Sequence, residues 1–485
     1  MTAAENTALH PYSALYDEYD YTIDDVTGKL PDELRGTIYR NGPGKMEAGG
    51  TQLGHIFDGD GMVTMYSMAD GRVHFRNRFV QTKHYQRSIV ADGAPFRALG
   101  TMRTGGVLAN ALRFPANVAN TAVVMNAGML LALWEGGRPT ELDPDTLRTK
   151  GEYDFDGELT WLGAFSAHPK WDGETGEMFN FGLALAPVPK LICYRVDRAG
   201  RMDRLGAVRL PGPMFNHDVG LTKRYMVFVI APLVFPTRKF LRAAFGLLNY
   251  IDAIEYQASM GTMIALVPRD GGKPRIFHTD ALLHLHLANA YDDENNDVVV
   301  DVLNYHASWK QLNGQLAGLA SLMHTSTMSF GGMPTRIRIS GSGRVTIDEF
   351  SSTRGEFPTI NVSRMAKANR YFYLSAGTNG SLYPNAVTKI DNDTGAESSF
   401  AFPDAHLPHE AIFAGRPGAT EEDDGWLIGP VLDASKNAAY LSVFDAKDVA
   451  AGPVYAGRLR HHLPLSFHGC YTTRIAQPHA PAAHR

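Results

Sequence analysis

One segment near the middle of the chain, residues 282–301, carries side chains that could do chemistry. His284 and His286 are two residues apart among apolar residues, and a polar turn precedes the apolar run 298–300. This pattern predicts two strands joined by a turn, with both imidazoles on one face of the first strand. A histidine on an inward apolar face is either hydrogen-bonded in the core or a metal ligand, and this segment alone favours the core interpretation.

The chain around this segment repeats one local pattern of a short β-branched or aromatic run, a turn rich in Gly, Asp and Asn, and another such run. Such turns lie at residues 69–71, 172–176, 198–200, 270–272, 340–343 and 391–395. Many hairpins in a chain of 485 residues with 48 glycines predict an all-β fold, which is a sandwich, a barrel or a propeller. The chain has no strict repeat that chooses among these three architectures.

Helical patterns are scarce, and no shift in composition marks a linker between domains. They occur near residues 238–254 and 312–323, which we interpret as insertions between strands. We therefore expect one domain over residues 1–485, with residues 1–32 as an N-terminal extension and residues 476–485 as a flexible Pro/Ala-rich tail.

Composition and charge exclude several classes of protein. The net charge of -5 gives no indication of a nucleic-acid partner. Two cysteines, Cys193 and Cys470, exclude a disulfide framework and a cysteine-based zinc or iron–sulfur site, and they suit a reducing cytoplasm. The N-terminus lacks the apolar run of a signal peptide, and the longest apolar run, residues 225–235, is too short to span a bilayer. We expect a cytoplasmic protein.

Three segments near the N-terminus carry a family resemblance. Residues 36–44 read G-T-I-Y-R-N-G-P-G, in which we interpret residues 40–44 as a tight turn. Residues 55–63 read H-I-F-D-G-D-G-M-V, and the D-G-D-G run is also interpreted as a turn because a calcium loop has more oxygen ligands at regular spacing. Together with N-R-F-V-Q-T-K-H-Y at residues 77–85, these segments resemble the opening of the carotenoid cleavage oxygenase family.

The resemblance implies a seven-bladed β-propeller with a helical and loop cap over its axis, and one Fe(II) ion on that axis held by four histidines. Four motifs match in family order: A-H-P-K, F-N-H-D, H-L-A-N-A and F-H-G. The spacing to Asn-Ala selects His286 over His284, and Asn216 departs from the family, which more often has Met at this position. The implied ligands are His168, His217, His286 and His468. Four imidazoles suit several metals, so the choice of iron follows from the family.

The same resemblance implies further site residues. The family holds the second nitrogen of its ligating histidines with three glutamates, and the matching positions are Glu135, Glu356 and Glu410, each of which alone would be interpreted as a turn carboxylate. Thr121 resembles a family threonine close to the iron that restricts access to it. Phe57 and Trp134 are candidates for the wall of a substrate tunnel, and ordinary propeller core equally accounts for Phe57.

The implied activity is that of a non-haem iron dioxygenase with O2 as co-substrate. Dioxygen adds across a C=C bond of a carotenoid or apocarotenoid polyene, and the adduct splits into two carbonyl compounds, one of them a retinal-like aldehyde. Stilbene-cleaving and isoeugenol-cleaving branches have K-E-D where this chain has Trp134-Glu135-Gly136, and the missing lysine favours an apolar polyene. The alternatives are a stilbene-cleaving or phenylpropene-cleaving dioxygenase, an isomerohydrolase of the same family and a non-catalytic binding propeller.

The insertion at residues 232–256 adds an expectation about partners. It combines an apolar helical face with Arg238, Lys239 and Arg242. An apolar stripe is usually core, but a basic amphipathic helix also lies on bilayers, where carotenoids dissolve. We therefore expect peripheral contact with the inner face of a membrane, and the oligomeric state stays open. The predicted membrane patch consists of Phe240, Leu241, Phe245 and Leu248.

Overall fold

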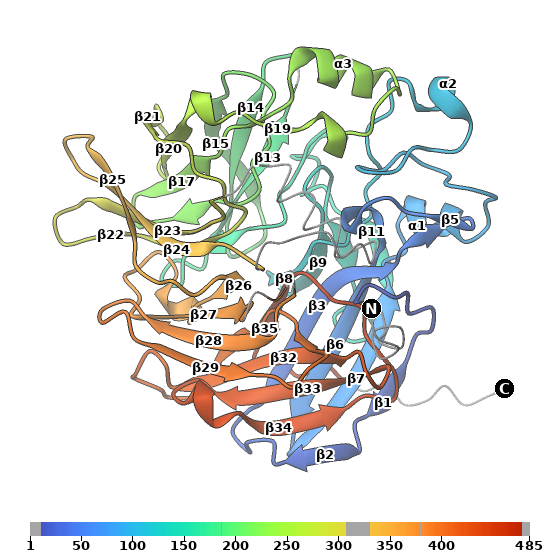
Figure 1. Ribbon diagram of the computed structural model, residues 1–485, viewed down its shortest axis with the longest axis vertical. Helices are drawn as coiled ribbons and strands as arrows, with labels where there is room; N and C mark the ends of the chain where they lie inside the picture. The colour runs from blue at the N-terminus through green and yellow to red at the C-terminus, as the bar shows by residue number, and fades with distance from the viewer. Residues whose placement is uncertain (1–10, 186, 307–329, 379–380, 382, 478–485) are drawn as a thin grey trace.

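Seven antiparallel sheets follow one another round a ring (Figure 1). This computed structural model describes residues 11–185, 187–306, 330–378, 381 and 383–477. The arrangement is a seven-bladed β-propeller, which confirms the expected fold class. Apolar side chains on the facing surfaces of successive sheets form the core, and one cluster joins Ile38 and Phe75 of the first blade to Ile428 and Leu441 of the last.

The blades are built in chain order. The first two consist mainly of β3 (Gly36–Lys45), β6 (Asp60–Ala69), β7 (Arg72–Phe79), β8 (Ala122–Asn126), β9 (Met129–Leu133), β10 (Thr140–Leu142) and β11 (Thr149–Glu152). The next two consist of β12 (Lys170–Trp171), β13 (Met178–Ala184), β14 (Lys190–Val196), β15 (Met202–Arg209), β16 (Gly220–Leu221), β17 (Tyr225–Ile230), β20 (Thr262–Pro268) and β21 (Arg275–Thr279).

The remaining three blades follow the same antiparallel order. Two consist of β22 (Leu287–Asp292), β23 (Val298–Asn304), β24 (Met333–Ile339), β25 (Val345–Glu349), β26 (Gly355–Thr359), β27 (Tyr371–Ala376), β28 (Ala386–Asp391) and β29 (Glu397–Ala401). The last contains β30 (His406–Pro408), β31 (Ile412–Gly415), β32 (Gly425–Asp433), β33 (Ala438–Asp445) and β34 (Pro453–Arg458).

Strands from both ends of the chain complete the first and last blades. β1 (Asp20–Thr22) pairs with β7, β2 (Asp25–Gly28) pairs with β34, and β35 (Gly469–Thr472) pairs with β3. Residues 20–28 of the expected N-terminal extension therefore belong to the propeller. Ala476, at the start of the expected flexible tail, is buried, and its N–H donates to Thr37 Oγ1 at 2.9 Å. Residues 478–485 lie outside the described residues.

The six predicted Gly/Asp/Asn turns are where the sequence places them. The D-G-D-G run is only partly a turn, because Asp58 ends the 3-10 helix η1 (Ile56–Asp58) and Asp60 and Gly61 begin β6. All six Gly/Asp/Asn turns connect neighbouring strands of a blade, and residues 287–304 form the expected hairpin of β22 and β23. The interpretation of residues 40–44 as a tight turn is wrong, because they continue β3. Gly42 serves close packing instead, since a Cβ there would lie 2.6 Å from the Cα of Ser466.

The connections between strands carry the short helices. They are α1 (Lys83–Ser88), α2 (Gly106–Asn110) and α3 (Thr237–Ala244), and α2 and α3 lie at the top of Figure 1. The helix expected over residues 238–254 is shorter, because Gly246 adopts a left-handed φ of 76° soon after α3 ends. The helical pattern near residues 312–323 falls outside the described residues. Among the described helices, none has the length and apolar character needed to cross a membrane.

Candidate metal centre

Four histidines from four blades meet at one place in the propeller. Each lies directly before, or within three residues of, the first residue of an inner strand. Because the inner strands of a propeller converge on its axis, residues far apart in sequence become neighbours there. The histidines and the strands they precede are His168 with β12, His217 with β16, His286 with β22, and His468 with β35.

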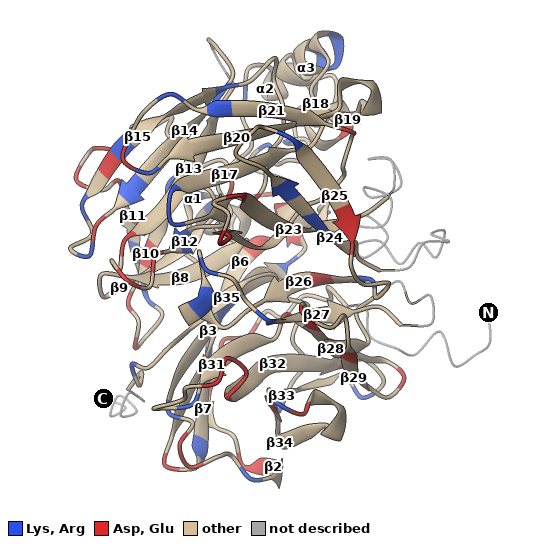
Figure 2. Ribbon diagram, turned by 90° about the vertical axis from the view of Figure 1, so that its left-hand side faces the viewer, with Lys and Arg blue, Asp and Glu red and all other residues tan. Residues whose placement is uncertain are grey.

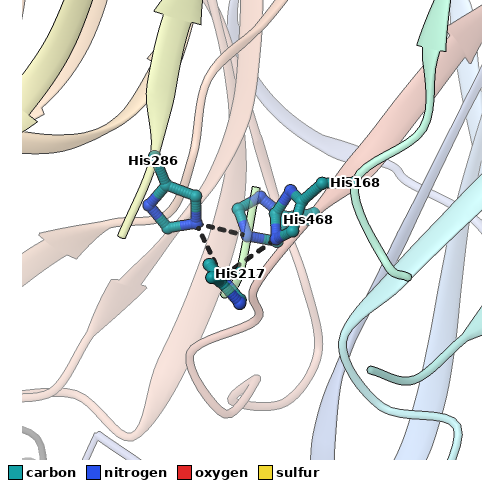
Figure 3. A group of neighbouring side chains, drawn as sticks. All are labelled: His168, His217, His286 and His468. Carbon is teal, nitrogen blue, oxygen red and sulfur yellow. Dashed lines mark hydrogen bonds between the residues drawn. The ribbon is translucent and has the colours of Figure 1, made fainter. Parts of the chain in front are cut away.

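The four imidazoles turn their Nε2 atoms toward one another (Figure 3). His217 Nε2 lies 2.9 Å from that of His168 and 3.2 Å from that of His286, and 3.1 Å separates the latter from His468 Nε2. All four ligand atoms lie within 4.8 Å of one another. Neighbouring ligands about 2.1 Å from a common ion have this spacing, so the donor set fits one metal ion.

Carboxylates lie beside the outer nitrogens of three of these rings, and two of them, Glu356 and Glu410, are hydrogen-bonded there. His286 Nδ1 lies 2.5 Å from Glu356 Oε2, and His468 Nδ1 lies 2.9 Å from Glu410 Oε1. His217 Nδ1 lies 3.2 Å from Glu135 Oε1. A carboxylate at Nδ1 leaves the Nε2 lone pair facing inward and makes the imidazole a stronger ligand. The structure thus brings each of the three glutamates next to one histidine.

Burial favours the neutral, metal-binding form of His168 and His468, whereas His286 is influenced more by its carboxylate neighbour. Burial, and then the neighbouring imidazoles, hold the pKa of His168 well below its usual value, and burial lowers the pKa of His468. Burial also acts against the charged form of His286, but the Glu356 carboxylate outweighs it and raises the pKa of that imidazole. Burial opposes ionisation of Glu356 as well, yet His286 and Tyr305 together hold its pKa below the usual value.

Supporting residues that the sequence analysis missed hold the glutamates. The Tyr305 hydroxyl donates to Glu356 Oε1, and the phenol is buried. Arg40 donates from NH1 to the backbone oxygen of Glu410 at 2.7 Å and to its Oε2 at 3.2 Å. Arg40 is the first residue of the R-N-G-P-G run and is fully buried. A buried arginine needs a paired carboxylate, and Glu410 supplies it here. No local pattern in the sequence identifies Tyr305.

An apolar cavity adjoins three of the four histidines. Its wall includes Phe57 and Thr121, together with His217, His286 and His468. The Thr121 carbonyl accepts a hydrogen bond from the His468 N–H at 3.1 Å, which ties the threonine to the metal group. Other apolar residues of the wall are Leu285, Phe330, Phe357, Leu465 and Phe467.

Two residues considered in the sequence have other positions. Trp134 is not among the residues that line this cavity. Its indole packs so closely on Gly136 that a Cβ added to this glycine would lie 2.8 Å from the ring. The role of Trp134 in a tunnel wall therefore stays a prediction. His284 is buried, and its Nε2 lies 2.7 Å from the Val229 carbonyl oxygen, which accounts for it as a core histidine.

The expected membrane patch divides into two pairs. Phe240 and Leu248 pack against the cluster that contains Leu285, because they occupy the inner side of the insertion. Both side chains are only partly buried, so their part in a membrane patch stays a prediction. Leu241 and Phe245 are 48% and 52% exposed.

The fold and the site together define a class: a β-propeller metalloenzyme with a four-histidine centre and an adjoining apolar cavity. A profile of the retinal pigment epithelial membrane protein family matches residues 12–473. The chain belongs to this family, which is that of the carotenoid cleavage oxygenases. It is an enzyme of the dioxygenase class, with Fe(II) as its cofactor and O2 as co-substrate.

Individual relatives agree with this assignment. The apocarotenoid-15,15'-oxygenase of Synechocystis sp. is 32% identical over 96% of this chain and 95% of that protein. Resveratrol cleavage oxygenase 1 of Aspergillus fumigatus is 30% identical over 92% of each chain, and isoeugenol monooxygenase of Pseudomonas nitroreducens is 28% identical over 93% and 94%. Cobalt-substituted Synechocystis apocarotenoid oxygenase superposes with a TM-score of 0.87, at 30% identity over 97% and 99% of the chains.

Proposed function

We propose that this protein cleaves one C=C bond of an apocarotenoid polyene and releases two carbonyl products, one of them a retinal-like aldehyde. The observation that carries the proposal is the apolar, aromatic cavity that reaches His217, His286 and His468. A conjugated hydrocarbon chain offers little besides apolar surface for recognition, so a wall of this kind suits it. The relative that is 32% identical is named an apocarotenoid oxygenase.

The residues of the chain have two tasks in this reaction. Bound iron supplies the activation of dioxygen, and the two electron pairs of the cleaved double bond are used in forming two C=O bonds, so no organic reductant is needed. The aromatic wall excludes water and holds the polyene with one double bond at the metal. Thr121 narrows the cavity beside His468, which restricts the positions that this bond can occupy.

A surface patch supports uptake of this substrate from a membrane. We define the apical patch as the exposed apolar side chains of two touching segments: Val107, Leu108, Leu112, Phe114, Leu241, Phe245 and Leu247. The segments meet where the Leu112 N–H donates to the Ala244 carbonyl at 2.7 Å. Exposed apolar groups gathered in this way favour contact with a bilayer.

Charge and packing connect the apical patch with both the membrane and the cavity. Arg238, Lys239 and Arg242 lie on α3, where Figure 2 shows basic residues. Basic side chains beside apolar ones favour anionic lipid headgroups. Leu285 and Tyr305, which line the cavity, pack in the same hydrophobic cluster as the inner side of the insertion. This apolar continuity between the insertion and the cavity supports uptake of the polyene from the inner face of a membrane.

The proposal is tested by incubating iron-loaded protein in air with a detergent-solubilised apocarotenal and, separately, with a hydroxystilbene. We expect loss of the polyene absorbance and appearance of a shorter aldehyde by mass. Cleavage of the stilbene alone would contradict the substrate class and leave the chemistry in place. Protein that holds one iron and cleaves neither compound would contradict the proposed function.

A further inference from the structure

His409 is a buried histidine that lies outside the metal group. The residue is 3% exposed, and it lines the apolar cavity together with Phe57 and Phe467. Its N–H donates to the Pro430 carbonyl, and its own carbonyl accepts from Ser375 Oγ, both at 3.0 Å. These contacts fix the main chain, so the fold sets the position of the ring.

The hydrogen bonds at Nδ1 determine which nitrogen of His409 carries the proton. The Ser466 N–H donates to Nδ1 at 3.1 Å, and a backbone amide can only donate, so Nδ1 presents a lone pair. The Ser466 hydroxyl lies 2.8 Å from the same nitrogen and itself accepts from Arg40 Nε at 2.9 Å. An imidazole whose Nδ1 accepts carries its proton on Nε2.

The environment of the ring agrees with this neutral tautomer. Burial, and then the positive charge of Arg40, hold the pKa of His409 well below its usual value. The Nε2–H is therefore a permanent donor. Within the part of the chain that the structure describes, this atom is buried and has no hydrogen-bond partner. An unsatisfied buried donor is unfavourable, and a bound acceptor would offset this cost.

We propose that His409 donates a hydrogen bond from Nε2 to an oxygen atom carried by the substrate, either a carbonyl or a hydroxyl group. An unpaired donor in a largely apolar wall selects oxygen-bearing polyenes over hydrocarbon carotenoids. It also fixes the distance between that oxygen and the metal, and hence which double bond is cleaved. The inference deepens the proposed function and rests on it for the class of substrate.

Two substitutions separate the donor from the packing of the ring. His409→Asn keeps an acceptor near the Nδ1 position and lacks a donor at the Nε2 position, whereas His409→Gln places an amide N–H near the Nε2 position. Binding is measured without oxygen, in detergent, for an apocarotenal and for a hydrocarbon polyene of equal length. The carbonyl stretch of the bound apocarotenal is recorded by Raman spectroscopy.

We expect the carbonyl stretch to move to lower frequency in the wild-type protein and in His409→Gln, and to stay unshifted in His409→Asn. We also expect His409→Asn to lower the affinity for the apocarotenal by about tenfold relative to the affinity for the hydrocarbon. Equal weakening of both compounds, or an unshifted carbonyl in the wild-type protein, would overturn the inference.

Failure of this inference can be told apart from failure of the proposed function. A wild-type protein that shifts the carbonyl without oxygen but leaves the compound intact in air contradicts the cleavage reaction and supports the role of His409. A protein that cleaves the apocarotenal while its carbonyl stays unshifted contradicts the role of His409 alone.

Discussion

His284 and His286 are two positions apart and have different roles, because one bonds to the neighbouring strand and the other precedes an inner strand at the axis. His284 Nε2 lies 2.7 Å from the Val229 carbonyl oxygen, whereas His286 is held between Glu356 and the other three imidazoles. Periodicity predicts that both rings are buried. It does not predict which one reaches the axis, since that depends on contacts between blades.

A carboxylate at Nδ1 should contribute measurably to metal affinity. We expect Glu356→Gln to weaken iron binding by about 10- to 100-fold, because the amide carries no charge to strengthen His286 as a ligand. The measurement is the iron retained after dialysis against increasing chelator concentrations. Glu349→Gln is the matched control, since Glu349 pairs with the partly exposed His306. Equal retention by both variants would show that Glu356 has no such role.

Asp58 introduces a pH dependence of stability that is separate from the metal site. Its carboxylate accepts hydrogen bonds from the Gly100 N–H and from Thr101 Oγ1, and burial raises its pKa to about 6 from a usual value of 3.8. As the pH rises from about 4 to 6, the unfolded chain loses this proton before the folded chain does. Folding should therefore become less favourable by about 3 kcal/mol across this range and stay constant above it.

Asp58→Asn should remove this slope. The control is Asp70→Asn, at an 80% exposed side chain in the turn between β6 and β7. The measurement is the free energy of unfolding at several pH values between 4 and 7. A slope that persists unchanged in Asp58→Asn would contradict the assignment.

At the scale of elements, α3 shows what an amphipathic pattern does and does not specify. The pattern correctly indicates an apolar face and a basic face, but it assigns Phe240 and Phe245 to one surface. In the structure Phe240 packs inward, and Phe245 follows the last turn and is exposed. Residues five apart on a helix lie about 140° apart around its axis, so helical geometry itself turns Phe245 away from Phe240.

The apical patch, which two neighbouring segments form, is the proposed site of attachment to membranes. We expect Phe245→Glu to lower binding to anionic lipid vesicles by about tenfold, because it places a charge in the apical patch. Vesicle sedimentation measures the bound fraction. Val454→Glu is the control, since Val454 is an exposed apolar residue on β34, at the opposite end of the molecule from α3 in Figure 1. Equal binding by the two variants would exclude the apical patch as the attachment site.

At the scale of the whole molecule, the ring depends on strands that are distant in sequence. The turns and alternating runs predict hairpins, and the four motifs predict the propeller through the family resemblance. The pairing of β2 with β34 and of β35 with β3 has no local signal, because such long-range contacts depend on the complete ring. The same limit applies to Tyr305 and His409, whose partners lie on other blades.

Removal of the N-terminal strands tests the closure of the ring. Deletion of residues 1–28 exposes the edges of β7 and β34 and removes Leu15 and Ile23 from the core, so we expect Tm to fall by about 10 °C or more. Val26→Ala, which keeps the strand and changes an exposed side chain, should leave Tm nearly unchanged. Calorimetry of both variants provides the comparison, and an unaltered Tm after the deletion would contradict this account of closure.

The central claim is that four histidines assemble one iron centre that carries out cleavage. The most direct measurement is the iron content and apocarotenal cleavage of His286→Ala, with His284→Ala as the matched control. We expect His286→Ala to retain no stoichiometric iron and to be inactive, and His284→Ala to retain iron, because its ring bonds only to the core. A His286→Ala variant that holds one iron per chain and cleaves the polyene would contradict the account.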